Sequence, residues 1–225
     1  MFQNIWEENY AKKVALNKYP WDFVVTFVFN YFNRNLPKQS QKILELGFGA
    51  GCNISFFAHE GFDSYGVEAS TSAYTHAKNW LSQEGLTAEL KNESFTTLSY
   101  ENEYFDMIVD RASLTCIPYN DCCKVFHEVK RVLKKDGVFL FSPYSKAHTS
   151  YITGRTNRNI LTTITQGSLV GVGDLCFYSY EMICEIAKKT SLEIVKCEHI
   201  EKKEMMSSEV HAEWHVVLKN TETLI

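Results

Sequence analysis

The chain has 225 residues and is 45% hydrophobic, so it can form one large domain or two small ones around a sizeable core. Its net charge of −4 argues against a dedicated nucleic-acid binder, which would usually be basic. No apolar run approaches the length of a membrane span, and the N-terminus lacks the basic and apolar regions of a secretory signal. We therefore expect neither a nucleic-acid nor a membrane partner. These numbers leave the oligomeric state open.

Seven cysteines are scattered along the chain, an odd number without a CxxC pair. Because no secretory signal is expected, they predict reduced thiols in a cytoplasmic protein. A zinc site needs ligands clustered at set spacings, and the sequence holds no such cluster, so we expect no metal.

Two helices are predicted at the start of the chain, over residues 3–16 and 20–34. Pro20 suits the first turn of the second helix. An apolar stripe on that helix predicts packing against the core, and its members are Phe23, Phe27, Val28 and Tyr31.

Strand-like and helix-like segments alternate from about residue 41 to 140, which predicts a parallel sheet with helices on its faces. The strands are expected at 43–46, 64–67, 88–90, 104–109 and 138–141, and the helices from 52, at 71–84 and at about 119–134. Residues 142–178 show no clear period, and so long a loop inside a compact domain is usually functional. A helix at about 179–190 follows. Two strands, 192 to about 200 and 214–218, then predict an antiparallel hairpin.

Three glycines, Gly47, Gly49 and Gly51, alternate between the first strand of this region and the next helix. Glycine permits a positive φ and lets a ligand lie against the backbone. Open α/β sheets bind ligands in the crevice at the carboxyl ends of their strands, and a helix N-terminus there favours a carboxylate. A dinucleotide-binding dehydrogenase would have glycine or alanine where this chain has Cys52. Glu68 ends the next strand, where a carboxylate can accept both hydroxyls of a ribose. Alternatively, Glu68 is a solvated acid at a strand end.

Four segments, in this order, resemble the class I S-adenosylmethionine-dependent methyltransferases, in particular their small-molecule, type 11-like subgroup. The segments are 45–51, 66–70, 104–109 and 129–140. The resemblance implies a doubly wound Rossmann-like sheet of seven strands, mostly parallel with an antiparallel last strand, and helices on both faces. It implies S-adenosylmethionine as cofactor and S-adenosylhomocysteine as product. It also implies one domain over 1–225, with an N-terminal helical lid (1–35), a cofactor-binding core (36–141), a substrate-side segment (142–178) and a C-terminal helix and hairpin (179–225).

The resemblance also implies which residues contact the cofactor. Gly47, Phe48 and Gly49 would lie under the methionine part, Glu68 would hold the ribose, and Ser94 replaces an acid that the family places near the adenine amine. The complete expected set is Trp6, Tyr10, Glu45, Gly47, Phe48, Gly49, Asn53, Glu68, Ala69, Ser70, Ser94, Phe95, Asp110, Arg111 and Ala112.

Methyl transfer is an in-line displacement at a sulfonium methyl group, so positioning supplies much of the catalysis, with a base where the acceptor must lose a proton. Asp110, by its place after the fourth strand, and His148, which can titrate near neutral pH, are the catalytic candidates. Alternatively, Asp110 caps its loop and His148 is an exposed loop residue. The candidate substrate contacts are Tyr144, His148, Tyr151, Arg155, Arg158 and Tyr178.

The sequence thus predicts O- or N-methylation of a small polar metabolite, sugar-bearing or phosphorylated because tyrosines and arginines gather in 142–178. A nicotinamide-dependent oxidoreductase and a non-catalytic S-adenosylmethionine-binding protein remain alternatives.

Overall fold

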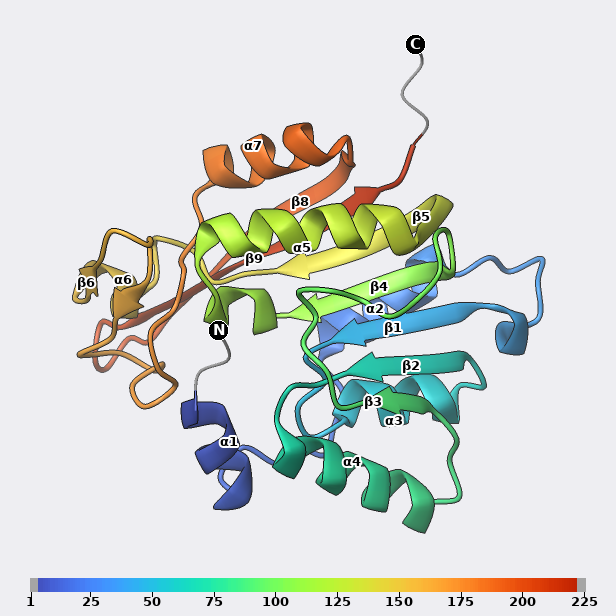
Figure 1. Cartoon of the computed structure of the whole chain (residues 1–225). Coiled ribbons are helices and arrows are strands. Elements are labelled where there is room, and N and C mark those ends of the chain that lie inside the picture. Colours follow the sequence, from blue (N-terminus) through green and yellow to red (C-terminus); the bar gives the residue numbers. More distant parts are fainter. Residues whose placement is uncertain (1–3, 222–225) are drawn as a thin grey trace.

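Short runs of branched and aromatic residues form seven strands of one sheet (Figure 1). The computed structural model describes residues 4–221. In spatial order the strands are β3 (Glu89–Lys91), β2 (Asp63–Val67), β1 (Lys42–Leu46), β4 (Phe105–Arg111), β5 (Leu133–Ser142), β9 (Val210–Lys219) and β8 (Glu193–Lys203). Pairing is parallel from β3 to β5, while β9 runs antiparallel to both of its neighbours. The predicted seven-stranded sheet with an antiparallel last strand is confirmed.

Helices cover both faces of this sheet, as the predicted alternation requires (Figure 1). They are α1 (Asn4–Ala11), α2 (Asp22–Tyr31), α3 (Cys52–His59), α4 (Thr71–Gln83), α5 (Tyr119–Val132), α6 (Thr149–Ile152) and α7 (Tyr180–Thr190), with 3-10 turns η1 (Lys38–Ser40) and η2 (Ser113–Cys116). One buried cluster joins the sheet to α5 and α7, and a second joins it to α2, α3 and α4. Successive residues of β4 alternate between these clusters, with Met107 and Val109 in one and Ile108 in the other. No helix within residues 4–221 is long and apolar enough to cross a membrane.

Several predicted boundaries are wrong. Residue 3 of the first predicted helix lies outside the described residues, and α1 ends at Ala11, two residues before Lys13 takes a positive φ of 59°. Helix α2 begins at Asp22, so Pro20 precedes the helix instead of lying in its first turn. The final hairpin is longer than predicted because β8 and β9 remain paired as far as Lys203 and Val210.

Residues 142–178 are not a long unstructured loop. They contain α6 and a small antiparallel pair, β6 (Arg155–Thr156) and β7 (Thr162–Thr163). These elements are too short to leave a hydrophobic period in the sequence. Figure 1 shows this segment and α1 at the end of the sheet toward which the parallel strands point, so both flank the predicted cofactor crevice.

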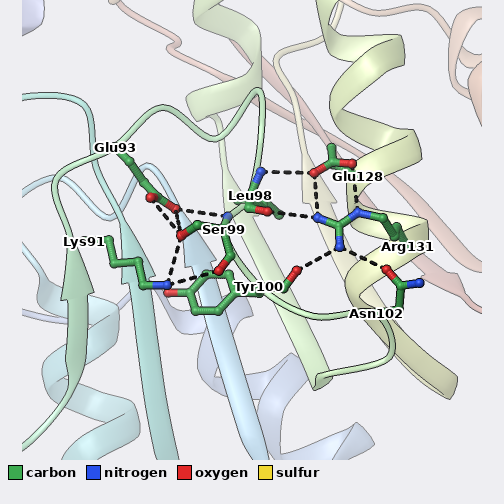
Figure 2. Close-up of polar contacts among 8 residues, drawn as sticks. All are labelled: Lys91, Glu93, Leu98, Ser99, Tyr100, Asn102, Glu128 and Arg131. Carbon is green, nitrogen blue, oxygen red and sulfur yellow. Dashed lines mark hydrogen bonds and ion pairs between the residues drawn. The ribbon is translucent and has the colours of Figure 1, made fainter.

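An arginine on α5 fixes the connection between β3 and β4 (Figure 2). Arg131 pairs with Glu128 through two hydrogen bonds of 2.7 and 2.9 Å. Its guanidinium also donates to the carbonyls of Leu98 and Tyr100 and to the side chain of Asn102. The Leu98 amide donates in turn to Glu128. The connection is therefore attached to α5 by both its amide and its carbonyl groups.

Candidate functional site

Three positions of the turn after β1 favour glycine. Gly47, Gly49 and Gly51 have φ values of +65°, +53° and +89°, in the left-handed region that favours glycine. A methyl group on Gly47 would collide with the side chain of Ser113, and one on Gly49 would collide with the phenol oxygen of Tyr10. The backbone conformation and the close neighbours therefore both disfavour larger side chains at these positions.

Glu68 is bound to this turn. One of its carboxylate oxygens accepts a hydrogen bond from the Gly49 amide at 2.9 Å, and the other accepts one from the Ser70 amide at 2.8 Å. The carboxyl group is buried, and this burial raises its pKa, while the two amide bonds oppose that shift. Each oxygen keeps a lone pair, and Glu68 lines the cavity described next. The acid can therefore accept two further hydroxyls.

A cavity of about 370 Å³ opens over the turn, between α1 and the carboxyl ends of the strands. It is lined by Trp6, Tyr10, Gly47, Glu68, Ala69, Ser94, Phe95, Thr96, Arg111, Ala112, Ser113, Thr115, Cys116, Ile117, Tyr144, Val172 and Leu175. One group of these residues follows β2 and β3, and the other follows β4 and β5. Since β1 lies between β2 and β4 in the sheet, the glycine turn separates the two groups. The cavity therefore has two ends of different composition.

Two buried carboxylates beside the turn each have an unpaired oxygen. Glu45 accepts a hydrogen bond from Asn53 at 2.7 Å through Oε1, and its Oε2 has no partner. Asp110 accepts bonds from Ser113 and Leu114 through Oδ1, and its Oδ2 has no partner. Burial raises the pKa of Glu45 to about 8 and that of Asp110 to about 6. An ammonium group such as that of methionine would supply the donors that these oxygens lack.

Helix α1 covers the cavity in this structure. The Glu7 carboxylate accepts hydrogen bonds from the Ser70 hydroxyl at 2.6 Å and from the Ser72 amide at 3.2 Å, at the positive N-terminus of α4. Hydrogen bonds from the Ser70 and Ser72 side chains lower the pKa of Glu7. This contact brings Trp6 and Tyr10 over the turn, where both line the cavity. That α1 acts as a moving lid stays a prediction.

Nine of the predicted cofactor residues line the cavity, and the other six lie around it. Phe48 is buried with the core under Gly66, so only its backbone is available to a ligand. Ser70 caps α4 through the Ala73 amide. Gly49 forms the turn itself beneath Tyr10. Glu45 and Asn53 are buried and hydrogen-bonded to each other. Asp110 is also wholly buried, and its Oδ1 caps the η2 turn. The predicted alternative for Asp110, a loop cap, is what the geometry shows.

Of the predicted substrate contacts, Tyr144 alone lines the cavity. Its hydroxyl accepts a hydrogen bond from the Arg111 guanidinium at 3.0 Å. Tyr178 is wholly buried against Phe141 and Tyr119, so no substrate can reach it. Tyr151 packs on Phe177 outside the cavity.

The remaining candidates also lie outside the cavity. Arg155 and Arg158 are exposed on and after the short β6 strand. His148 is wholly buried and caps α6 by accepting the Ser150 amide, so it is neither an exposed loop residue nor a cavity base. Burial, together with the neighbouring His211, lowers the pKa of His148 to about 4, which keeps the ring neutral.

Sequence reasoning missed seven residues of the cavity wall: Thr96, Ser113, Thr115, Cys116, Ile117, Val172 and Leu175. Their position after a strand end could have indicated the first five. Nothing local marks Val172 and Leu175, because they come from a segment without a hydrophobic period. Across residues 4–221, no group of three or more histidine, cysteine or acidic side chains is arranged to hold a metal ion.

The raised pKa values predict a proton release when the cofactor product binds. The ordinary pKa values are 4.5 for Glu45 and 3.8 for Asp110, whereas the pKa values in the folded protein are about 8 and 6. At a pH between the ordinary and the folded values, the folded protein therefore binds more protons than the unfolded one. Its free energy of unfolding should therefore fall as pH rises through this window. A bound ammonium favours the ionised carboxylates, so affinity for S-adenosylhomocysteine should rise between about pH 6 and 8.

Calorimetry at pH 7 in phosphate and in Tris buffer checks this prediction. Because the two buffers differ in ionisation enthalpy, proton release appears as different binding enthalpies in the two titrations. Identical enthalpies would show that neither carboxyl group changes its protonation on binding.

Comparison with known proteins agrees with this geometry. Residues 43–137 match the family model described as a methyltransferase domain. A ubiquinone biosynthesis O-methyltransferase from Roseobacter denitrificans is 26% identical over 157 residues, which are 65% of this chain and 61% of that relative. The chain thus spans less than two thirds of the length of this curated relative.

Solved structures show the same fold. A S-adenosylmethionine-dependent methyltransferase from Methanosarcina mazei aligns over 90% of this chain and 99% of its own, with a TM-score of 0.69 and 18% identity. A Burkholderia thailandensis 1,6-didemethyltoxoflavin-N1-methyltransferase with bound S-adenosylhomocysteine aligns over 96% and 85%, with a TM-score of 0.69 and 13% identity.

Residues 43–137 therefore match a methyltransferase domain, and the glycine turn, Glu68 and the sheet order agree with that match. S-adenosylmethionine stays the predicted cofactor, and the Burkholderia structure of the same fold contains bound S-adenosylhomocysteine.

Proposed function

We propose that the protein methylates a hydroxyl oxygen on a small, largely apolar ring compound such as a phenol. The observation that carries this proposal is the composition of the cavity end that follows β4 and β5. Ile117, Val172 and Leu175 form an apolar wall there. The Tyr144 hydroxyl, bonded to Arg111, is a polar group at the same end of the cavity. An apolar body with one hydroxyl group matches such a surface.

The cavity composition favours this acceptor over the phosphorylated metabolite expected from the sequence. A phosphate is usually held by several cations or by an arginine fork. Arg155 and Arg158 are exposed outside the cavity, and Arg111 is the one cationic side chain among its described lining residues. Moreover, Arg111 already bonds Tyr144 and stacks 3.6 Å above the Trp21 ring.

The name of the Roseobacter relative also supports a hydroxyl acceptor, since that protein is an O-methyltransferase of ubiquinone biosynthesis. Quinones derive from phenols by oxidation, so a phenolic ring is a chemically consistent acceptor class. At 26% identity, this support extends to the class of acceptor and not to a particular molecule.

The main contribution of this chain to methyl transfer is to position the cofactor and the acceptor. S-adenosylmethionine would supply an activated methyl group to the acceptor oxygen, which must first have released its proton, and S-adenosylhomocysteine would be the leaving product. Glu68 would hold the nucleoside end, and the unpartnered oxygens of Glu45 and Asp110 would accept hydrogen bonds from the ammonium. Tyr144 accepts from Arg111, so its own proton is free to bind the acceptor oxygen. The apolar wall and α1 exclude water from the reacting groups.

A transfer assay with methyl-labelled S-adenosylmethionine tests the proposal. Catechol, hydroquinone and 4-hydroxybenzoate serve as oxygen acceptors, and the corresponding anilines and thiophenols serve as matched nitrogen and sulfur acceptors. We expect labelled methyl ethers from at least one phenol. Transfer to the anilines alone would overturn oxygen methylation. Binding of S-adenosylhomocysteine without transfer to any member would favour a non-catalytic binding protein.

A further inference from the structure

A buried group of ionisable side chains lies behind Tyr144, outside the cofactor cavity. His211, Glu213 and His215 alternate along β9, so their side chains share one face of the sheet. Glu213 is only 5% exposed, and both of its oxygens have partners. The methyl-transfer scheme above uses none of these three residues.

Strand β9 brings Glu213 directly beside Tyr144. Beyond the end of β5, the Trp214 amide donates to the Pro143 carbonyl at 2.8 Å, and the Ser145 amide donates to the Ala212 carbonyl at 2.9 Å. Tyr144 and Glu213 are antiparallel bridge partners between these two bonds. Directly opposed residues of an antiparallel pair project from the same face, so the two side chains are neighbours.

A chain of hydrogen bonds assigns the proton of each histidine in this group. The Ser150 amide donates to His148 Nδ1 at 3.0 Å, so the proton of the neutral ring is on Nε2. That Nε2 lies 3.3 Å from His211 Nδ1 and can only donate to it. The His211 proton is then on Nε2, 3.3 Å from Glu213 Oε2. Ser168 Oγ, also 3.3 Å from His148 Nε2, accepts as well.

Glu213 therefore receives an imidazole N–H at each oxygen, from His211 and, at 2.9 Å, from His215. Burial by itself would raise the pKa of Glu213, but these two bonds and the charge of Arg111 lower it well below its usual range. The carboxylate is thus a fixed negative charge. A matching positive charge is needed nearby, because an unpaired buried charge is costly.

Arg111 is the cation whose charge acts on Glu213. Its guanidinium lies 3.6 Å from the centre of the Trp21 ring and 5.8 Å from the centre of the Tyr144 ring. It also lines a second cavity of about 540 Å³ together with His211, Glu213 and His215. The other charged residues around that cavity are Asp22 on α2 and Lys196, Glu198 and Lys202 on β8, of which Lys196 and Glu198 form an ion pair at 2.9 Å.

We propose that Glu213 is a positioning residue for the acceptor site. Its charge holds Arg111 in the place from which the guanidinium bonds the Tyr144 hydroxyl, and this bond leaves the phenol proton directed toward the acceptor. The inference rests on the proposed function, because it places the acceptor against Tyr144. The inference also gives His148 a structural role. His148 is held by the Ser150 amide and binds His211, which in turn binds Glu213.

The test replaces Glu213 with glutamine, which keeps the shape and removes the charge, and uses Glu209→Gln on the same hairpin, at an exposed position, as the matched control. The acceptor is the phenol that the wild-type protein methylates best. For Glu213→Gln we expect an S-adenosylhomocysteine Kd within about twofold of wild type and a kcat/KM for the phenol at least about tenfold lower. Glu209→Gln should leave both values unchanged.

Coupling between Glu213 and Tyr144 separates positioning from a general structural role. Tyr144→Phe should lower kcat/KM as much as Glu213→Gln does, and the double variant should be no worse than Tyr144→Phe, because the two residues act in series. Losses that multiply in the double variant would overturn the inference. Glu213→Asp keeps the charge and should recover part of the activity, and it replaces Glu213→Gln in the cycle if the glutamine variant does not fold.

A readout without any acceptor distinguishes failure of this inference from failure of the proposed function. Nitrogen-15 NMR of the Arg111 guanidinium should show restricted rotation of its terminal groups in the wild type and free rotation in Glu213→Gln. An unchanged Arg111 signal overturns the inference even if phenols are methylated. If no phenol is methylated but Arg111 is released, the proposed acceptor is wrong and the Glu213–Arg111 link holds.

Discussion

Replacing Glu68 with alanine is expected to weaken S-adenosylhomocysteine binding by ~1.5–3 kcal/mol, which corresponds to about 10- to 150-fold in Kd. The carboxylate faces the cavity and can accept two ribose hydroxyls, so the substitution removes both charge-assisted bonds. It also removes the acceptors of the Gly49 and Ser70 amides, which loosens the turn on which the methionine part would lie. Isothermal titration calorimetry measures the effect directly.

Two further variants make this result specific. Glu68→Gln keeps one carbonyl acceptor and should lose less affinity than Glu68→Ala. Glu101→Ala removes an exposed acid from the connection between β3 and β4 and should bind like the wild type. If Glu68→Ala bound S-adenosylhomocysteine as tightly as the wild type, Glu68 would have no place in the cofactor site.

Replacing Arg131 with methionine is expected to lower the free energy of unfolding by ~2–3 kcal/mol. The methionine fills similar space but leaves the carbonyls of Leu98 and Tyr100 without their donor and Glu128 without its partner. We expect a smaller loss of stability than for a fully buried ion pair, because the Arg131 side chain is 32% exposed and water can replace part of the network. For a chain of this length, the melting temperature should fall by about 4–12 °C.

Thermal unfolding followed by circular dichroism measures this loss, and Lys124→Met on the same helix is the matched control. Lys124 pairs with Asp121 one turn away, but its side chain is 74% exposed. Its replacement should change stability by less than about 0.5 kcal/mol. Equal melting temperatures for the two variants would show that the Arg131 network does not stabilise the connection between β3 and β4.

Arg131 is also expected to influence the cofactor site from a distance. The connection that it fixes contains Ser94, Phe95 and Thr96, which line the cavity. A looser connection would cost ordering entropy when a nucleoside binds against it. The affinity of Arg131→Met for S-adenosylhomocysteine should therefore fall, but by less than that of Glu68→Ala.

The fold could be predicted from the sequence because its signals are local. Alternating strand and helix patterns leave few arrangements of a parallel sheet. The three glycines of the turn lie within five residues of the chain, and Glu68 directly follows the adjacent strand β2. Each of these features is formed by residues within a few positions of one another or on neighbouring strands. The seven-stranded sheet was accordingly predictable and is confirmed, and residues 43–137 match a methyltransferase domain.

The acceptor half of the site could not be predicted in the same way, because distant segments converge there. Arg111 ends β4, Tyr144 follows β5 and Glu213 lies in β9, and register and bridge pairing bring these segments together. Residue type alone made Arg155, Arg158 and Tyr178 candidate substrate contacts. In the structure both arginines are exposed outside the cavity, and Tyr178 is buried in the core.

Periodicity was thus sufficient for an α/β domain with a parallel sheet, since that depends on contacts between near neighbours. The resemblance of the glycine turn and the three other segments implied the seven strands and the cofactor. Which tyrosine faces the cavity, which histidine is neutral and which acid stays charged depend instead on desolvation and on contacts made in the folded chain, such as those of Arg111 with Tyr144 and of His148 with His211. The contact of His148 with His211 and the bridge of Tyr144 with Glu213 join residues more than 60 positions apart, and they exist only after the sheet has formed.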